Sequence, residues 1–171
     1  GKVSTPLSIS FDEFGDPAKS KLVMKRGTAT NVIEEATLGG GSITGLLRFQ
    51  NNDLSDAKNL LGRMAMAIGT TVNNQHKLGI DLNGAAGGDM FRVSALPDGL
   101  ASTTNTGAAT VQVAIQTTPT SGASSLAASS YVINFTGAAA GSITRESDGQ
   151  TTIFAASPIT IRLSITARCV L

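Results

Sequence analysis

One segment of this sequence, residues 55–78, has the apolar spacing of a long helix. Apolar or small side chains recur there every three or four residues, which places them on one face of a helix. Asp53 or Ser55 is expected to cap the start of this helix, and Gly79 to end it in the left-handed conformation. The apolar face consists of Ala57, Leu61, Met64, Ile68 and Val72, widened by Leu60 and Ala65.

A helix with an apolar face gains most of its stability by packing that face against something else. The flanking strands of the same chain can cover it, and burial in the chain's own core is the ordinary interpretation of such a stripe. The alternative is that helices outside this sequence cover it. The candidate subunit-packing face is then Leu61, Met64, Ile68 and Val72.

A polar corner is expected just before the long helix. Residues 39–42, Gly-Gly-Gly-Ser, end one element, and Ile43, Leu46 and Leu47 begin a shorter helical segment. Residues 50–53, Gln-Asn-Asn-Asp, are polar throughout, which is typical of a turn. The pattern therefore predicts a short helix, a corner and then the long helix.

The first part of the chain alternates apolar and polar residues, which is the pattern of a half-buried strand. Leu7, Ile9 and Phe11 form one such run, and residues 21–25 form a returning strand after the Phe-Gly-Asp-Pro turn at 14–17. Residues 32–35 add a short third strand. A β-hairpin with this extra strand therefore precedes the helical region.

From Arg92 onwards, short alternating runs separated by turn residues predict a β-domain. Asp148-Gly149 is a strong hairpin signal within it. The runs, at 110–117, 131–135, 142–145, 151–154 and 159–165, have the spacing of a small antiparallel sandwich or barrel. We therefore expect an α+β chain of two domains. Residues 1–91 would hold the hairpin and one long helix, and residues 92–171 the antiparallel β-domain.

Composition argues against several classes of partner and site. Charged residues make up 15% of the chain, the formal net charge is +1 and no basic cluster occurs, so nucleic acid and membrane surfaces are not expected partners. No apolar run reaches the roughly 20 residues of a membrane span. Cys169 is the single cysteine and His76 the single histidine, so neither an intramolecular disulfide nor a His-rich zinc site can form.

No catalytic, cofactor-binding or metal-binding residues are expected. His76 is interpreted as a histidine near the negative end of the helix dipole, since no nucleophile motif accompanies it. Residues 81–84, Asp-Leu-Asn-Gly, resemble the start of a calcium loop but lack its closing glutamate, so a turn is favoured. Asp12, Glu13 and Asp16 are interpreted as a solvated turn rather than as a catalytic carboxylate pair.

Several short pieces of the central region resemble one protein family in their order and spacing. They are Gly-Leu-Leu-Arg-Phe at 45–49, Asn-Asp-Leu at 52–54, Leu-Gly-Arg at 61–63, Asn-Asn-Gln-His at 73–76 and Gly-Ile-Asp-Leu at 79–82, with a Gly-rich exit to Phe91. This region resembles the central segment of the bacterial flagellar hook-associated protein 1 family, the first hook–filament junction proteins. The Thr-Arg-Glu-Ser-Asp-Gly hairpin at 144–149 resembles the family's β-domain, whereas the chain after Pro158 departs from its pattern.

The resemblance implies a secreted, extracellular structural subunit of the flagellum that joins hook to filament by subunit packing, without catalysis or cofactors. The implied partners are other copies of the chain in a ring, the hook protein and the next hook–filament junction protein. Because the family's terminal helical regions are not in this sequence, we expect a central fragment. The alternative is an extracellular, adhesin-like β-rich module that binds a ligand or surface, which a single tyrosine and no tryptophan disfavour.

Overall fold

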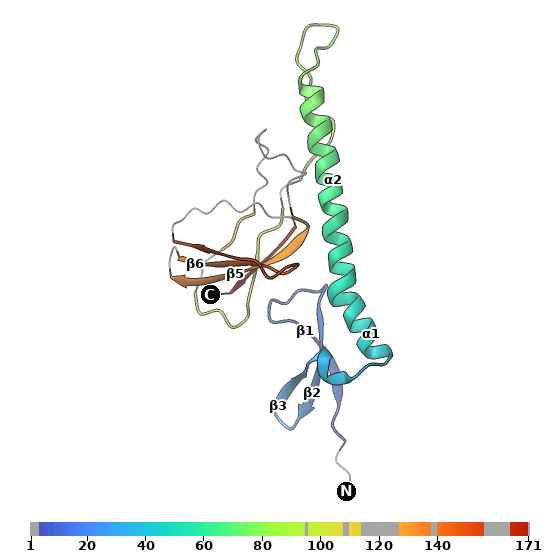
Figure 1. Ribbon diagram of the computed structural model, residues 1–171, viewed down its shortest axis with the longest axis vertical. Helices are drawn as coiled ribbons and strands as arrows, with labels where there is room; N and C mark the ends of the chain where they lie inside the picture. The colour runs from blue at the N-terminus through green and yellow to red at the C-terminus, as the bar shows by residue number, and fades with distance from the viewer. Residues whose placement is uncertain are drawn as a thin grey trace.

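A long helix forms the spine of the molecule, with two separate sheets beside it (Figure 1). The computed structural model describes residues 4–94, 96–107, 110–113, 127–137 and 140–155, and the backbone of 165–170. A three-stranded sheet lies near one end of the helix and a five-stranded sheet lies along its side. The α+β class and the long helix are thus confirmed. None of the helices in the described residues combines the length and the apolar character needed to cross a membrane.

The first sheet is built from the alternating segment at the start of the chain. β1 (Leu7–Phe11), β2 (Ser20–Arg26) and β3 (Ala29–Ile33) are antiparallel neighbours in that order, with Ile9 opposite Leu22. The hairpin and its third strand are confirmed, but β3 begins earlier than predicted, and a short 3-10 helix, η1 (Glu35–Leu38), follows it. Gly27 makes the tight β2–β3 turn at a φ of 64°, which glycine adopts without steric cost.

The helical region contains no corner. α1 (Ser42–Arg48), a π-helical turn η2 (Phe49–Asp53) and α2 (Leu54–Lys77) follow one another without a break. The N–H of Leu54 donates to the carbonyl of Phe49, five residues earlier, which is the hydrogen bond of a π-turn. The predicted corner was wrong because the polar side chains of Gln50 and Asn51 bond to Ser20 without leaving the helix.

Both expected ends of the long helix differ from the structure. Asp53 has helical dihedral angles, φ −61° and ψ −42°, and makes no side-chain cap, and Ser55 lies inside α2. At the other end Leu78 is still helical, with φ −79° and ψ −14°, and the N–H of Gly79 still bonds to a helix carbonyl. Gly79 does not have a positive φ and is therefore not left-handed. Gly84, with a φ of 81°, takes the positive-φ position in the turn that follows.

The second sheet is mixed. Its strands are β4 (Leu100–Ala101), β5 (Ser129–Gly137), β6 (Ala140–Arg145), β7 (Thr151–Phe154) and β8 (Ile165–Val170), in the order β4-β8-β5-β6-β7. β5, β6 and β7 are antiparallel, as predicted, and the Asp148-Gly149 hairpin joins the last two. β8 lies between β4 and β5 and is parallel to both. The β-sheet structure expected after residue 92 is confirmed, but the sheet is open rather than closed into a barrel.

Two of the predicted runs reach beyond the described residues. In the run 110–117, residues 110–113 lie in no strand and 114–117 are outside the described part of the chain. In the run 159–165, Ile165 is the first residue of β8 and residues 159–164 are outside it. The predicted strand at 110–117 is therefore wrong for its described residues, whereas the run 159–165 stays a prediction before Ile165.

The β-domain has its own apolar core. Among the described residues this core consists of Val111, Tyr131, Ile133, Ile143 and Phe154, with Val113 and Phe135 packed against it. The rings of Phe135 and Phe154 meet edge to face with centroids 5.6 Å apart, a favourable aromatic geometry. Leu22 of β2 and Leu47 of α1 are also buried, beside the first sheet. Each sheet therefore has apolar packing of its own.

Candidate functional site

The apolar stripe predicted on the long helix is exposed. Leu61, Met64 and Ile68 have 61%, 55% and 53% of their surface exposed, and Val72 is half-buried. Burial of this stripe in the chain's own core, the ordinary interpretation, is therefore wrong for the described part of the chain. In Figure 1 the larger sheet lies on one side of α2, and the opposite flank of the helix is bare in this view.

The face of α2 that packs against the rest of the chain is polar. Asn59 and Asn73 are 3% and 5% exposed, and Gly69 is buried on the same side. A helix turns by about 100° per residue, so Asn59 lies about half a turn away from Leu61 and Ile68. The helix is therefore amphipathic in the reverse of the usual sense. Its buried side chains, Asn59 and Asn73, are polar, whereas Leu61, Met64 and Ile68 are exposed to water.

Asn73 holds the segment that returns along the helix. Its Oδ1 accepts the N–H groups of Met90 at 2.9 Å and Phe91 at 2.8 Å, and its Nδ2 donates to the Phe91 carbonyl at 2.8 Å. The segment packs against the helix at Gly69, where an added Cβ would lie in ordinary van der Waals contact, 3.5 Å from Cγ2 of Val93. The amide supplies the extended segment with the hydrogen bonds that a neighbouring strand would otherwise supply.

Two further asparagines attach the other elements to the helix. Nδ2 of Asn59 donates to Oγ of Ser130 on β5 at 3.3 Å, in a buried contact. Oδ1 of Asn51, in η2, accepts the N–H of Ser20 at 2.8 Å, and its Nδ2 donates to the Ser20 carbonyl at 2.9 Å. Asparagine is a poor helix former. Its recurrence within a strongly helical pattern was a signal that the sequence analysis missed.

The apolar stripe continues into a groove beside the first sheet. The groove, with a volume of about 490 Å³, is lined by Ile9, Leu22, Ile43, Leu46, Leu47, Phe49, Gln50 and Leu54. Ile9, Leu46 and Phe49 are 70%, 68% and 55% exposed. Leu54 connects the groove to the stripe, and we refer to the two together as the apolar track. Exposed apolar surface of this kind is typical of interaction sites, and no pattern in the sequence indicated the groove.

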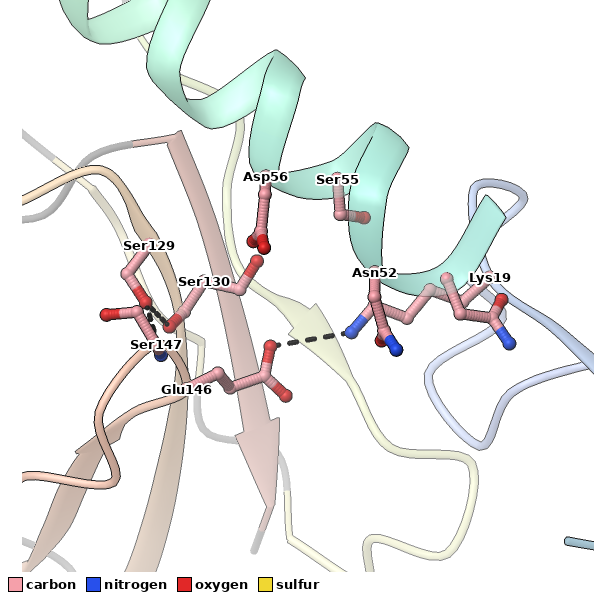
Figure 2. Close-up of a pocket in the computed structure, with 9 residues that line it drawn as sticks. Lys19, Asn52, Ser55, Asp56, Ser129, Ser130, Glu146 and Ser147 are labelled. Atoms are coloured by element: carbon pink, nitrogen blue, oxygen red, sulfur yellow. Dashed lines mark hydrogen bonds and ion pairs between the residues drawn. The ribbon is translucent and has the colours of Figure 1, made fainter. Parts of the chain in front are cut away.

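A polar cleft lies where the start of α2, the first sheet and the β-domain meet (Figure 2). Its volume is about 360 Å³, and it is lined by Lys19, Asn51, Asn52, Ser55, Asp56, Ser129, Ser130, Glu146 and Ser147. Nζ of Lys19 lies 3.5 Å from the Glu146 carboxylate. Oγ of Ser129 accepts the N–H of Ser147 at 3.0 Å. This cleft offers hydroxyl, amide and charged groups, so it is a polar joint between the elements.

The other candidate residues have structural roles. Nδ1 of His76 lies 2.7 Å from a backbone carbonyl, that of Gly88, near the end of α2. Oδ1 of Asp81 accepts the N–H groups of Asn83 and Ala85, each at 2.8 Å, so the predicted turn at 81–84 is present. Among the residues that the structure describes, no group of three or more His, Cys, Asp or Glu side chains gathers as a metal ion would require.

The acidic turn before β2 is buried rather than solvated. Asp12 and Asp16 are each 8% exposed, while Glu13 is exposed as predicted. Oδ1 of Asp12 accepts the N–H groups of Phe14 at 3.1 Å and Asp16 at 2.9 Å, and Oδ1 of Asp16 accepts the N–H of Ala18 at 2.8 Å. The prediction was wrong because a buried turn needs acceptors for its own backbone N–H groups, and short carboxylates supply them.

The titratable groups with the most perturbed pKa values lie around the β6–β7 hairpin. Nε of Arg145 donates to Asp148 at 2.9 Å, and this contact lowers the pKa of Asp148 to about 2 and raises the pKa of Arg145. Burial raises the pKa of the Tyr131 hydroxyl. The charged pair stabilises the turn between two strands. The side chain of Cys169 lies outside the described residues.

Comparison with known proteins identifies a family for most of this chain. The family model described as the flagellar hook-associated protein FlgK helical domain matches residues 1–91. Flagellar hook-associated protein 1 of Escherichia coli K12 is 40% identical over 121 residues, which cover 70% of this chain and 21% of the relative. The protein of the same name from Salmonella typhimurium is 37% identical over 79 residues, covering 46% of this chain and 14% of the relative.

A solved structure extends the likeness over nearly the whole chain. The flagellar hook junction protein FlgK from Burkholderia pseudomallei matches with a TM-score of 0.72 at 29% identity, covering 91% of this chain and 28% of that one. The chain thus spans about a fifth of the length of the Escherichia coli relative. From the family model and these relatives we conclude that the chain belongs to the family of the flagellar hook-associated protein FlgK.

Proposed function

We propose that this chain is part of a structural subunit that joins the hook of the bacterial flagellum to its filament by subunit packing, without catalysis. The relatives it resembles are named as hook-associated and hook junction proteins. Proteins of this family are extracellular parts of the flagellum, and the localisation of the chain follows from its family. Because the chain spans only part of its relatives, the proposal concerns what this part contributes to the assembly.

The observation that carries the proposal is the exposed apolar track. From Leu54 to Val72 its residues follow one another in steps of three or four, which is the repeat of a coiled-coil seam. A second helix packed along this stripe would cross α2 at about 20° and insert its side chains between those of the stripe. We assign Leu61, Met64, Ile68 and Val72 to the subunit-packing face on this ground, and the groove extends the same surface toward β1.

The proposed partners are other copies of the protein in a ring, the hook protein and the next hook–filament junction protein. A closed ring repeats the same contact at every subunit, so each contact can be weak while the assembly is stable. An apolar track along a rigid helix suits this role, because it offers the same packing geometry at each repeat.

We also propose that residues 1–91 and 92–171 are two domains, a helical layer and an outward β-domain. The two sheets share no strand in the described part of the chain, and the β-domain core contains residues of that domain alone. Residues 92–94 and 96–99, between them, lie in neither helix nor strand. These observations support a boundary near Phe91.

The adhesin-like alternative has less support. Tyr131, the only tyrosine, is 6% exposed in the β-domain core, and the chain has no tryptophan. Neither of these residue types therefore offers an exposed stacking surface for a ligand. The names of the relatives also favour assembly over surface binding.

Size-exclusion chromatography with light scattering tests the packing face. We expect the unmodified chain to self-associate. The Leu61→Asp variant should be a monomer with unchanged helical content, because self-association would bury its carboxylate in an apolar helix–helix contact. Leu82→Asp is the matched control, since Leu82 is fully exposed but lies beyond the stripe. It should leave the association unchanged. An unmodified chain that is a monomer, with Leu61→Asp behaving identically, would count against the proposed face.

A further inference from the structure

We propose that the β-domain can swing as a hinged unit relative to α2. The loop of residues 12–19, which we call the clasp loop, holds the β-domain in the arrangement described here. This inference concerns the surface between α2 and the β-domain, which we call the seam. It does not depend on the flagellar role. The argument rests on which groups are buried at the seam and on how the clasp loop reaches across it.

Among the residues whose side chains the structure describes, the fully buried ones at the seam are polar. Asn59, Ser129 and Ser130 are 3%, 1% and 7% exposed, and Asn59 bonds to Ser130 at 3.3 Å, near the limit for a hydrogen bond. The polar cleft opens beside this contact (Figure 2). When such groups separate, water replaces each hydrogen bond at a small net cost, whereas separating an apolar core would expose hydrocarbon to water. The seam is therefore a surface that can open.

The clasp loop reaches the β-domain at two points. The Glu13 carbonyl accepts the N–H of Thr103 at 2.7 Å. Nζ of Lys19 pairs with the Glu146 carboxylate at 3.5 Å, with the two side chains 18% and 34% exposed. In Figure 2 the lysine extends from the first sheet's side of the cleft to meet the glutamate from the β-domain.

The backbone at both ends of this ion pair is hydrogen-bonded. The N–H of Lys19 donates to the Asp16 carbonyl at 3.0 Å, and the buried Asp12 and Asp16 carboxylates shape the loop from inside. On the other side, the N–H of Glu146 donates to the Ser130 carbonyl at 2.9 Å. The Lys19–Glu146 ion pair is thus a latch across the polar cleft. Because the pair is only partly buried, it weakens as the salt concentration increases.

Distances between spin labels test this hinge. The labels are placed on Lys58→Cys in α2 and Ile153→Cys in β7, both exposed positions, in a Cys169→Ser background. We expect Lys19→Glu and Glu146→Lys each to shift the distance distribution to longer values, and the double variant to return it to the starting distribution. Lys25→Glu is the control, because it makes the same charge change on β2 at an exposed position and should cause no shift.

A salt titration provides a second measurement without any change at the latch. Raising the salt to about 1 M, where charges are screened beyond about 3 Å, should shift the same distribution in the same direction. The near-ultraviolet signal of Tyr131 reports whether the β-domain core stays folded in each sample. A distribution that neither charge reversal nor salt moves would overturn the proposal. The proposal would also be overturned if each single charge reversal shifted the distance distribution but the double variant did not restore it.

Discussion

The side chain of Asn73 forms a two-way hydrogen-bonded pair with the backbone of Phe91, with both bonds 2.8 Å long. It also accepts the N–H of Met90 at 2.9 Å. A residue inside a long helix thus fixes the extended segment that runs back beside it. The Asn73 amide group thus ties the end of α2 to its returning segment.

Replacing that amide should destabilise the chain. Three hydrogen bonds are lost in Asn73→Ala, and at about 1 kcal/mol each the free energy of unfolding should fall by about 2–3 kcal/mol. Urea unfolding measures the change, and hydrogen exchange at Met90 and Phe91 should accelerate. Asn74→Ala is the control, because Asn74 is an exposed neighbour on the same helix. Equal effects of the two variants would contradict the assigned role.

Two adjacent leucines of α1 should respond differently to truncation. Leu47 is 7% exposed and Leu46 is 68% exposed. Leu47→Ala should lower the free energy of unfolding by about 2–5 kcal/mol, since it leaves a cavity beside the first sheet. Leu46→Ala should change it by about 0.5 kcal/mol or less. Urea unfolding of both variants at low protein concentration distinguishes them, and a larger loss for Leu46→Ala would show that α1 packs by its other face.

A glycine in β6 is required by close contact. A Cβ at Gly141 would overlap the carbonyl oxygen of Asn134 and lie 2.7 Å from Cζ of Phe154. Gly141→Ala should therefore cost about 1–3 kcal/mol or more through overpacking. Gly137→Ala is the matched control in β5, because no atom lies within 4 Å of its added Cβ. Thermal unfolding followed by the Tyr131 signal should show a lower midpoint for the first variant alone.

The β6–β7 hairpin should carry an acid-dependent contribution to stability. The bond from Arg145 lowers the pKa of Asp148 in the folded chain to about 2, from an ordinary value of 3.8. Because the folded-state pKa is lowered, this stabilisation is complete above about pH 4 and is lost as the pH falls toward 2. Asp148→Asn should remove it, so its thermal midpoint should fall less steeply with acidification across this window. Parallel curves for the two proteins would contradict this.

Elements specified by local patterns were predictable from the sequence. The strand containing Leu7, Ile9 and Phe11 and the hairpin at Asp148-Gly149 depend on alternation and turn chemistry within a few residues. The position of β8 depends on its partners. Alternation around Ile165 predicts a strand but does not say that it lies between β4 and β5, parallel to both. Strand direction is set by the chain path, which no local pattern records.

The candidate face was predictable in its residues but not in its surroundings. The spacing of Leu61, Met64 and Ile68 predicts a common face, and the structure places them together on α2. The opposite face of α2, which carries Asn59, packs against the rest of the chain. This packing depends on specific amide contacts, such as the bond from Asn59 to Ser130. Hydrophobicity alone assigns the apolar face to the interior. This assignment fails here because hydrogen bonds determine which side of the helix is covered. Each of these bonds is directional and joins residues far apart in the sequence.

The π-turn between the two helices has a consequence for the apolar track. Five residues of regular α-helix would rotate Leu54 by about 140° away from Phe49, whereas the π-turn takes up those five residues in about one turn. The π-turn therefore brings Phe49, which lines the groove, closer to the side of the helix on which Leu54 begins the stripe. Deleting a single residue there would leave every side chain of α2 intact and still rotate the helix by about 100° relative to α1. The number of residues in this turn, more than their identity, sets the angle between the side of α1 that lines the groove and the side of α2 that carries the stripe.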